Sequence, residues 1–340
     1  MNGLTSRNWF LAVFSVLTSL CISQASATDW KMHAVWGEQR PEVSWLRGWS
    51  DRIRERTKGS LNITVYPGGS LGINDADVLR TLPQGNLYQA TLLYNGYVSR
   101  DSKPLALSYV VGSITSENDM LKLMPALDDI YAKTFAKWGI KYLGTIITPD
   151  ASVTIFCKEP FSSLDDLKKR KLRTWGAFDS DVFRKLGIAS SVIPQKDLYL
   201  ALQTGVVDCA QYWPSAALTV SLQEVAPYYS ELSANAPPLA LIVSQTAWDA
   251  LTAEQKEVVS SETVQLKEQI TSEFLAQRKQ AEGRTAYNAK GGKQQQPFSA
   301  ADQRRYSMAV QEAWKDESIK AGKDVLENFE QLQTSLKATK

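Results

Sequence analysis

Residues 186–213, LGIASSVIPQKDLYLALQTGVVDCAQYW, hold the pattern that decides the fold of this chain. An apolar pair, Val192-Ile193, is stopped by Pro194, and a helix is expected next over residues 198–203. A further strand is expected over residues 206–210. Strands that alternate with helices in this way indicate mostly parallel sheets covered by helices on both faces. The stretch therefore predicts an α/β fold.

The same alternation runs through the rest of the chain. Strand patterns occupy residues 61–66, 87–93, 153–157, 171–175 and 239–243, and helical patterns begin near residues 41, 74, 117, 163 and 178. Near the C-terminus, residues 252–255 match a capping box, and one apolar face continues after it to about residue 287. Such a helix would be about 50 Å long at roughly 1.5 Å per residue, which exceeds one small domain. We expect it to span two domains.

The N-terminal segment is expected to lie outside the fold. Residues 9–20 form an apolar run without charge, and Ala25-Ser26-Ala27 is a small-x-small cleavage site. Residues 1–27 therefore read as a cleaved signal peptide. Cys21 offers a lipoprotein alternative, but the residue before it is bulkier than such a signal favours. No later segment is apolar for long enough to span a membrane.

Composition narrows the possible partners. With 340 residues, 44% of them hydrophobic, the chain can bury one large or two medium cores, and its formal net charge is only +2. This near balance, without a run of Lys or Arg, argues against nucleic acid or a membrane surface as a partner. Removal of the signal peptide leaves Cys157 and Cys209. These two cysteines could form a disulfide in an oxidising compartment, or they could be two separate, small buried side chains.

One short motif invites an enzymatic interpretation. Residues 68–72, Gly-Gly-Ser-Leu-Gly, fit the nucleophile elbow of a serine hydrolase. That chemistry needs a base, normally a His late in the chain, but the only His is His33, which precedes Ser70. One His and two Cys cannot build a usual zinc site, and no Walker-A or dinucleotide fingerprint is present. The sequence therefore predicts no enzyme activity, no cofactor and no metal, with a hydrolase using Ser70 as the enzyme alternative.

Four stretches carry a resemblance to a known family. They are RIRERTKGSLNITVYPGGSLG (52–72), PFSSLDDLKKRKLRTWG (160–176), the stretch 186–213 with its LYLALQTGVVD core, and the opening of the long helix at 248–255. In this order they are similar to the solute receptors of tripartite ATP-independent periplasmic (TRAP) transporters, the dicarboxylate-receptor family. The resemblance covers the mature chain.

The resemblance implies a two-domain periplasmic-binding-protein-like fold, hinged around a ligand cleft and crossed by the long helix. Domain I would comprise residues 28–150 plus about 238–270, and domain II residues 151–237 plus about 271–335. The implied function is a periplasmic receptor that captures a small organic carboxylate. Its partners would be the small and large TRAP membrane subunits, which take up solute with an ion gradient. A ligand-binding sensor or interaction protein of the same fold is the alternative.

The resemblance also assigns the ligand carboxylate to Arg173. An Arg fork makes two parallel charge-assisted hydrogen bonds to a carboxylate, which supports that role. Strand alternation puts Arg173 and Trp175 on one face at the end of their strand, where ligands of α/β proteins usually bind. The same neighbourhood is expected to supply the other binding residues, which are Gln211, Tyr212, Trp213, Tyr94, Asn95 and Thr154.

Two departures from the family pattern bear on the ligand. Gln211 stands where many members have a Glu that helps to hold a metal ion in some, and a neutral amide weakens the case for an obligatory metal. Residues 152–156 lack the second Arg of sialic-acid-type receptors, and Thr154 lies near that position. We therefore expect a monocarboxylate or a ligand whose other end is neutral. The aromatic side chains near Arg173 favour an apolar or aromatic carboxylate over a sugar acid, because such rings bury apolar surface and stack.

The mature protein is expected to begin at Thr28, because Ala25-Ser26-Ala27 presents small residues to the signal peptidase. Intact-mass spectrometry of the protein from a periplasmic extract measures this directly. A mass that includes residues 1–27, or a lipid on Cys21, would contradict the expectation.

Overall fold

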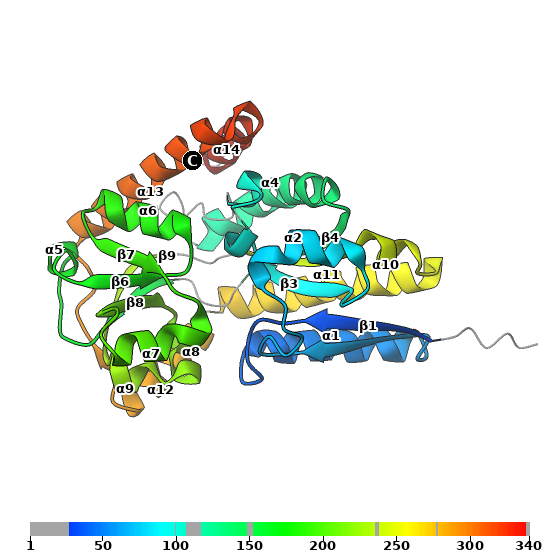
Figure 1. Cartoon of the computed structure of the whole chain (residues 1–340), viewed down its shortest axis with the longest axis horizontal. Coiled ribbons are helices and arrows are strands. Elements are labelled where there is room, and N and C mark those ends of the chain that lie inside the picture. The colour runs from blue at the N-terminus through cyan, green and yellow to red at the C-terminus, as the bar shows by residue number, and fades with distance from the viewer. Residues whose placement is uncertain are drawn as a thin grey trace, which may run out of the picture.

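The computed structural model describes residues 27–98, 100–106, 117–147, 152–234, 238–276 and 278–337. They form two β-sheets, each flanked by helices, which stand side by side in Figure 1. In spatial order, the first sheet contains β2 (Leu61–Tyr66), β1 (Thr28–His33), β3 (Ala90–Tyr94), β10 (Pro238–Ser244) and β4 (Ile140–Ile147). The second contains β11 (Lys293–Gln294), β9 (Tyr228–Ala234), β5 (Ser152–Cys157), β8 (Cys209–Tyr212), β6 (Lys171–Thr174) and β7 (Ala189–Val192). The predicted α/β fold with two sheets is confirmed, and we call each sheet with its helices a lobe.

Helices cover both sheets. The first lobe carries α1 (Pro41–Arg56), α2 (Val78–Thr81), α3 (Lys103–Ala106), α4 (Glu117–Ala136), α10 (Gln245–Asp249) and α11 (Ala253–Leu275). The second carries α5 (Leu164–Leu167), α6 (Ala177–Lys185), α7 (Leu198–Gln203), α8 (Pro214–Ala217), α9 (Leu222–Val225) and α12 (Arg278–Ala289). The short 3₁₀ turns are η1 (Asp75–Asp77), η2 (Leu82–Gln84), η3 (Asn95–Val98), η4 (Gln195–Asp197) and η5 (Leu218–Val220).

The helix starts follow the local sequence signals. Pro41 occupies the first turn of α1, where its missing N–H costs nothing. Ser163 and Thr252 each form a capping box, with Asp166 and Gln255 respectively, so that two backbone N–H groups at each helix start are bonded. These caps fix the ends of helices whose apolar faces then pack on the sheets.

The sheets are more mixed than the sequence predicts. Five neighbouring strand pairs are parallel and four are antiparallel, and every antiparallel pair involves β5 or β10. These two strands follow β4 and β9 along the chain, and each lies in the other sheet from its predecessor. A strand that enters a new sheet without a helical crossover does not have to run parallel to its neighbours. The two antiparallel strands therefore mark the chain's crossings between the lobes.

The long C-terminal helix of the sequence analysis is two helices in the structure. Helix α11 ends at Leu275 and α12 begins at Arg278, whereas one helix to about residue 287 was expected. Helix α11 packs against α1 and β4 of the first lobe, and α12 packs against α8 of the second. The stretch still passes from one lobe to the other, but each half is stabilised by a different lobe.

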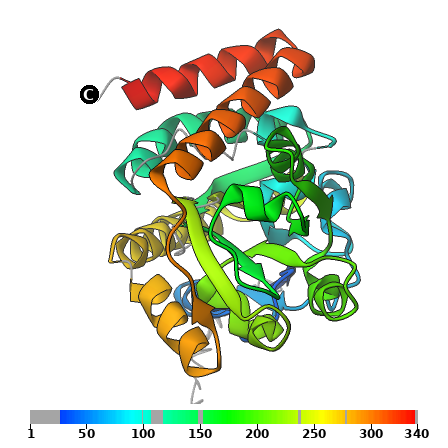
Figure 2. The same ribbon diagram turned by 90° about the vertical axis from the view of Figure 1, so that its left-hand side faces the viewer.

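Two further helices return to the first lobe. Helix α13 (Ala300–Ala321) packs against α6 and β9, and α14 (Lys323–Lys337) packs against α4. Figure 2 shows the pair lying over the top of the molecule, with α14 folded back along α13. Gly322, at a φ of 104°, permits the sharp turn between them. The domain boundaries given above remain a proposal, in which α14 is better grouped with the first lobe that it covers.

Strand β8 begins later than expected. The sequence predicts a strand over residues 206–210, but β8 covers Cys209–Tyr212, and the Val206 side chain is 58% exposed. Asp208 explains the shift, because its carboxylate accepts a hydrogen bond from the backbone N–H of Lys171 and its own N–H bonds to the Lys171 carbonyl. Because of these bonds, the pairing of β6 with β8 begins after Val206 and Val207. Strand β8 then continues through Gln211 and Tyr212.

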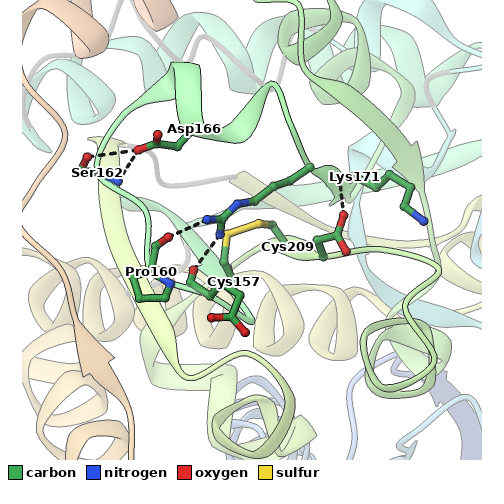
Figure 3. The surroundings of a disulfide bond; sticks show 9 residues. Cys157, Pro160, Ser162, Asp166, Lys171 and Cys209 are labelled. Atoms are coloured by element: carbon green, nitrogen blue, oxygen red, sulfur yellow. Dashed lines mark hydrogen bonds between the residues drawn. A yellow bond between two sulfur atoms is a disulfide. The ribbon is translucent and has the colours of Figure 1, made fainter.

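A disulfide joins Cys157 and Cys209, which settles the question that the sequence left open. The two residues are directly opposite each other in the antiparallel pair β5–β8, so the backbone already holds their side chains together. Figure 3 shows the disulfide between the two strands, with Pro160 and Ser162 nearby. It lies at the start of β8, three residues before Tyr212. The disulfide therefore fixes the strand at the end opposite to its aromatic residues.

Replacing both cysteines by alanine should lower the free energy of unfolding by about 2–4 kcal/mol. The bond closes a loop across 52 residues, so its loss restores chain entropy to the unfolded state. Guanidinium denaturation of Cys157→Ala/Cys209→Ala measures the change, with reduced wild-type protein as a control that should behave alike. Equal stability of the oxidised wild type and the variant would contradict this expectation.

Candidate functional site

The carboxyl ends of β3, β6 and β8 meet at the seam between the lobes. A narrow cavity there is lined from both sides, by Trp36, Glu42, Tyr94, Tyr97 and Leu239 of the first lobe and by Trp175, Gln195 and Trp213 of the second. Ligands of α/β proteins bind beyond the carboxyl ends of strands, where the loops leave the sheet. The seam is therefore the candidate binding site.

Arg173 lies next to this seam in a fixed orientation. It comes from β6, is only 2% exposed, and donates from Nε to the Ile193 carbonyl at 2.8 Å. Its Nη1 donates to the Gln211 carbonyl at 3.2 Å, and its guanidinium carbon lies 6.0 Å from the centre of the Tyr212 ring. Both of these acceptors are backbone carbonyls, which orient the guanidinium and carry no net charge of their own. The group is thus set up to attract an anion.

Aromatic rings form the walls around Arg173. The indoles of Trp175 and Trp213 stack with their ring centres 4.5 Å apart, and both side chains are buried. Across the seam, Tyr94 and Tyr97 pack edge to face at 4.9 Å. These rings give the site flat apolar surfaces of the kind that hold the body of an organic ligand.

The first lobe adds a buried ion pair that the sequence analysis missed. Arg40 donates from Nε and Nη2 to the two carboxylate oxygens of Glu42, at 3.0 and 2.5 Å. The Arg40 guanidinium carbon also lies 5.7 Å from the centre of the Trp213 ring, so it bridges the lobes. Pro41 at the start of α1 places Arg40 and Glu42 side by side. Only that proline hinted at the arrangement in the sequence.

Several buried polar atoms at the seam have no hydrogen-bond partner within the described ranges. They are Oδ1 and Nδ2 of Asn95, Oε1 of Gln211, Oδ2 of Asp179 and Nε1 of both Trp175 and Trp213. Leaving a buried polar group unsatisfied costs about 1–3 kcal/mol, so proteins seldom gather such groups without an occupant. Their concentration here indicates a site for a polar small molecule, with both donors and acceptors facing it.

Asp179 is the most perturbed acid at the seam. Burial raises the pKa of its carboxyl to about 6, although the Gln211 amide and the Arg173 charge act in the opposite direction. Gln211 donates from Nε2 to Asp179 Oδ1 at 3.2 Å. The residue was missed because an acid in the first turn of α6 has an ordinary explanation in the helix dipole.

Burial also raises the pKa of the Tyr97 hydroxyl well above its usual value, with the Asp75 charge adding to the effect. Tyr97 therefore stays neutral at any physiological pH, and its hydroxyl serves as a hydrogen-bonding group. Its η3 turn directly follows β3, which carries Tyr94.

Seven of the eight predicted site residues gather at this seam, and Thr154 stands apart. Trp175, Trp213 and Tyr94 line the cavity, and the others that gather there are Arg173, Gln211, Tyr212 and Asn95. Thr154 is fully buried within β5, directly opposite Tyr212, and its hydroxyl bonds to Ser152 at 3.1 Å. It supports Tyr212 from behind and does not line the cavity.

The glycine-rich motif has a structural role. Gly68 and Gly69 adopt positive φ angles and donate backbone hydrogen bonds to Trp36 and Ala34, which hold the loop between β1 and α1. Ser70 lies exposed in this turn. His33 is fully buried and bonds to Asp75 at 2.9 Å. The geometry of a serine nucleophile with its base is therefore not formed by these residues.

Two other kinds of feature are absent from the residues that the structure describes. Within these residues, no group of three His, Cys, Asp or Glu side chains is placed to hold a metal ion. Over the same ranges, no helix combines the length and the apolar character that a bilayer crossing needs.

Known proteins resemble this chain in sequence or in fold. A solute-binding protein of Sulfitobacter sp. (strain NAS-14.1) is 24% identical over 233 residues, which is 66% of this chain and 68% of that protein. A monocarboxylate 2-oxoacid-binding periplasmic protein of Nostoc sp. (strain PCC 7120) is 24% identical over 248 residues, covering 69% of this chain and 65% of that protein. A Bordetella pertussis extracytoplasmic solute receptor binding pyroglutamic acid superposes with a TM-score of 0.83 at 22% identity, covering 92% of this chain and all of that one.

The family assignment rests on the length of the sequence match. Residues 32–320 match the family described as bacterial extracellular solute-binding protein, family 7, and this range includes both sheets except the first residues of β1. The resemblance to TRAP receptors found in the sequence is thereby confirmed. The protein belongs to the bacterial extracellular solute-binding proteins of family 7.

Proposed function

We propose that this protein is a non-enzymatic periplasmic receptor that captures a small organic monocarboxylate between its lobes and delivers it to TRAP membrane subunits. The observation that carries the proposal is the buried Arg173, held by two carbonyl groups at the carboxyl edge of β6 among stacked aromatic rings. A guanidinium in this setting is a carboxylate anchor, because a planar fork matches two carboxylate oxygens.

One anchored carboxylate fits the charges at the seam better than two. Arg40 is engaged by both oxygens of Glu42, so its charge is balanced within the first lobe. Arg173, which two neutral backbone carbonyls orient, lies where a ligand anion would meet its charge. Two similar proteins accord with a single carboxylate, since one is described as binding monocarboxylate 2-oxoacids and another as binding pyroglutamic acid.

The aromatic walls and the unsatisfied polar atoms of the site indicate the chemistry of the rest of the ligand. The indoles of Trp175 and Trp213 favour a flat or apolar body, as the sequence analysis expected. The unsatisfied atoms of Asn95, Gln211 and Asp179 require polar groups as well, which the aromatic residues alone did not predict. We therefore propose a compact carboxylate with an apolar surface and at least one further hydrogen-bonding group.

Replacing Arg173 by alanine should weaken carboxylate binding by about 2–5 kcal/mol, and Arg173→Lys should not restore it. Lysine keeps the positive charge but lacks the planar fork. Isothermal calorimetry with the carboxylates identified by a thermal-shift screen measures both variants. Arg170→Ala is a matched control, because Arg170 also bonds to two backbone carbonyls, those of Glu159 and Pro160, but directly precedes β6, at the end of the strand opposite to Trp175 and the seam. Near wild-type affinity in either Arg173 variant would remove that residue from the anchoring role.

Ligand binding should draw the two lobes together, with the motion concentrated in the crossings near residues 150 and 238. The first crossing lies outside the described residues, and the second adjoins β10. Small-angle X-ray scattering should show a smaller radius of gyration with saturating carboxylate, and no change for Arg173→Ala under the same conditions. A wild-type radius that does not respond to ligand would exclude the hinged clamp.

A further inference from the structure

The buried carboxyl of Asp179 has one bonded oxygen and one open oxygen. Gln211 Nε2 donates to Oδ1 at 3.2 Å, while Oδ2 has no partner within the described part of the chain. The residue is 4% exposed, so water does not provide an easy substitute. One face of this carboxyl is therefore ready for a group that is absent from the protein itself.

Two glycines place the open oxygen at the seam between the lobes. A Cβ atom added to Gly176 would lie 3.7 Å from Asp179 Oδ2 and 3.9 Å from the carbonyl oxygen of Gly96. Gly176 directly follows Trp175 of the second lobe, and Gly96 follows Asn95 of the first. The absence of a side chain at Gly176 therefore leaves room for about a methyl group beside the buried Oδ2, on the side that faces Gly96 of the first lobe.

Among the residues that the structure describes, the polar and charged side chains around Asp179 come from three other elements. Arg173 of β6 is a cation, and Gln211 of β8 is a neutral hydrogen-bond donor. Tyr306 of α13 contributes a hydroxyl group, which remains neutral because burial raises its pKa. The neighbouring strand β7 brings no titratable side chain. Lys185 pairs with Glu312 and Asp316 at the other end of α6, six residues further along the helix. Of these three groups Arg173 is the cation, and its charge would act on both Asp179 and a bound anion.

We propose that Asp179 contacts the captured ligand as a protonated acid, donating a hydrogen bond from Oδ2 to a ligand oxygen, so that binding of a monoanion takes up one proton. This inference rests on the proposed function. Two carboxylates that share one buried cation cannot both remain ionised cheaply, and the proton goes to the one that is already harder to ionise. In the protonated form, Oδ1 still accepts from Gln211 and the Oδ2–H group is the donor. The proton comes from the solvent, and no covalent bond changes in the ligand.

This arrangement makes affinity fall as the pH rises. The pKa of Asp179 in the free protein is about 6, so above that pH the carboxyl must first gain a proton before the ligand binds. Affinity should then drop about tenfold per pH unit above 6, since one pKa unit corresponds to a factor of ten. An ionised Asp179 that accepted a hydrogen bond from the ligand would give the opposite slope.

The test is isothermal calorimetry at pH 6, 7 and 8 with pyroglutamate, pyruvate, mandelate and phenylacetate, which are all ionised over this range. Titrations at pH 8 in phosphate and in Tris, whose heats of ionisation differ, report the protons exchanged. We expect uptake of close to one proton at pH 8 and weaker binding there than at pH 6. Affinity that is constant or rises with pH would overturn the inference while leaving the receptor function intact. If none of the four binds, both are overturned.

Asp179→Asn supplies a second readout, because asparagine mimics the neutral acid in shape and keeps a donor beside the ligand. It should bind more tightly than the wild type at pH 8, by up to about a hundredfold because pH 8 is two units above the pKa of Asp179, and show no pH dependence. Asp181→Asn on the same helix is the control, since Asp181 pairs with Arg184 at the surface and should leave the wild-type pH slope in place. Weaker binding by Asp179→Asn at pH 8 would count against the protonated donor.

The stability of the free protein checks the same titration without any ligand. Because the folded pKa of Asp179 lies above its unfolded value, its contribution is fully present near pH 4 and is lost as the pH rises through 6. Asp179→Asn should therefore have a higher Tm than the wild type at pH 7.5, and the difference should vanish near pH 4. A constant difference would show that Asp179 is already ionised in the free protein across this range.

Discussion

The buried guanidinium of Arg173 is the group around which the site is organised. A cation with 2% exposure has lost most of its hydration, which the protein must replace with oriented dipoles. The Ile193 and Gln211 carbonyls supply these dipoles, because β6 and its neighbours β7 and β8 all end at the same edge of the sheet. A group of this kind attracts an anion strongly, since the surrounding protein screens its charge far less than water would. The aromatic walls and the open polar atoms follow from the need to hold whatever that anion is attached to.

Much of the fold could be predicted because it follows from short-range signals. The capping boxes at Ser163 and Thr252 and the alternation over Leu61–Tyr66 depend on residues within a few positions of each other, and each was found where the sequence indicated. The start of β8 and the break between α11 and α12 were not, because they depend on contacts with other elements. The family resemblance pointed to Arg173, and strand alternation pointed to the rings around it, which the structure places at the same seam. Asp179 and Glu42 carried no local signal, because their importance comes from burial beside residues distant in sequence.

The lobes are joined by more than the two strand crossings. Helices α11 and α12 pass from the first lobe to the second, and α13 and α14 pass back, with Lys103 of α3 pairing with Glu317 of α13 at 2.8 Å. The cleft is therefore bounded by connections on more than one side, which restricts how the lobes can turn. The disulfide at the start of β8 keeps that strand fixed to β5, the strand into which the chain enters from the first lobe. Movement of the second lobe is thus transmitted to Gln211 and Tyr212 as movement of a rigid sheet.

The strand order of the first sheet also bears on how the protein is made. Strand β4 joins that sheet only through β10, whose last residue is Ser244, while the whole second sheet except β11 is encoded between them. The first lobe therefore cannot be completed from the first half of a growing chain. Strands this distant in sequence pair slowly, because the entropy of closing a long loop is lost before the contacts between the strands form. Such a chain remains incompletely folded until late in its synthesis, when the residues of β10 have been added.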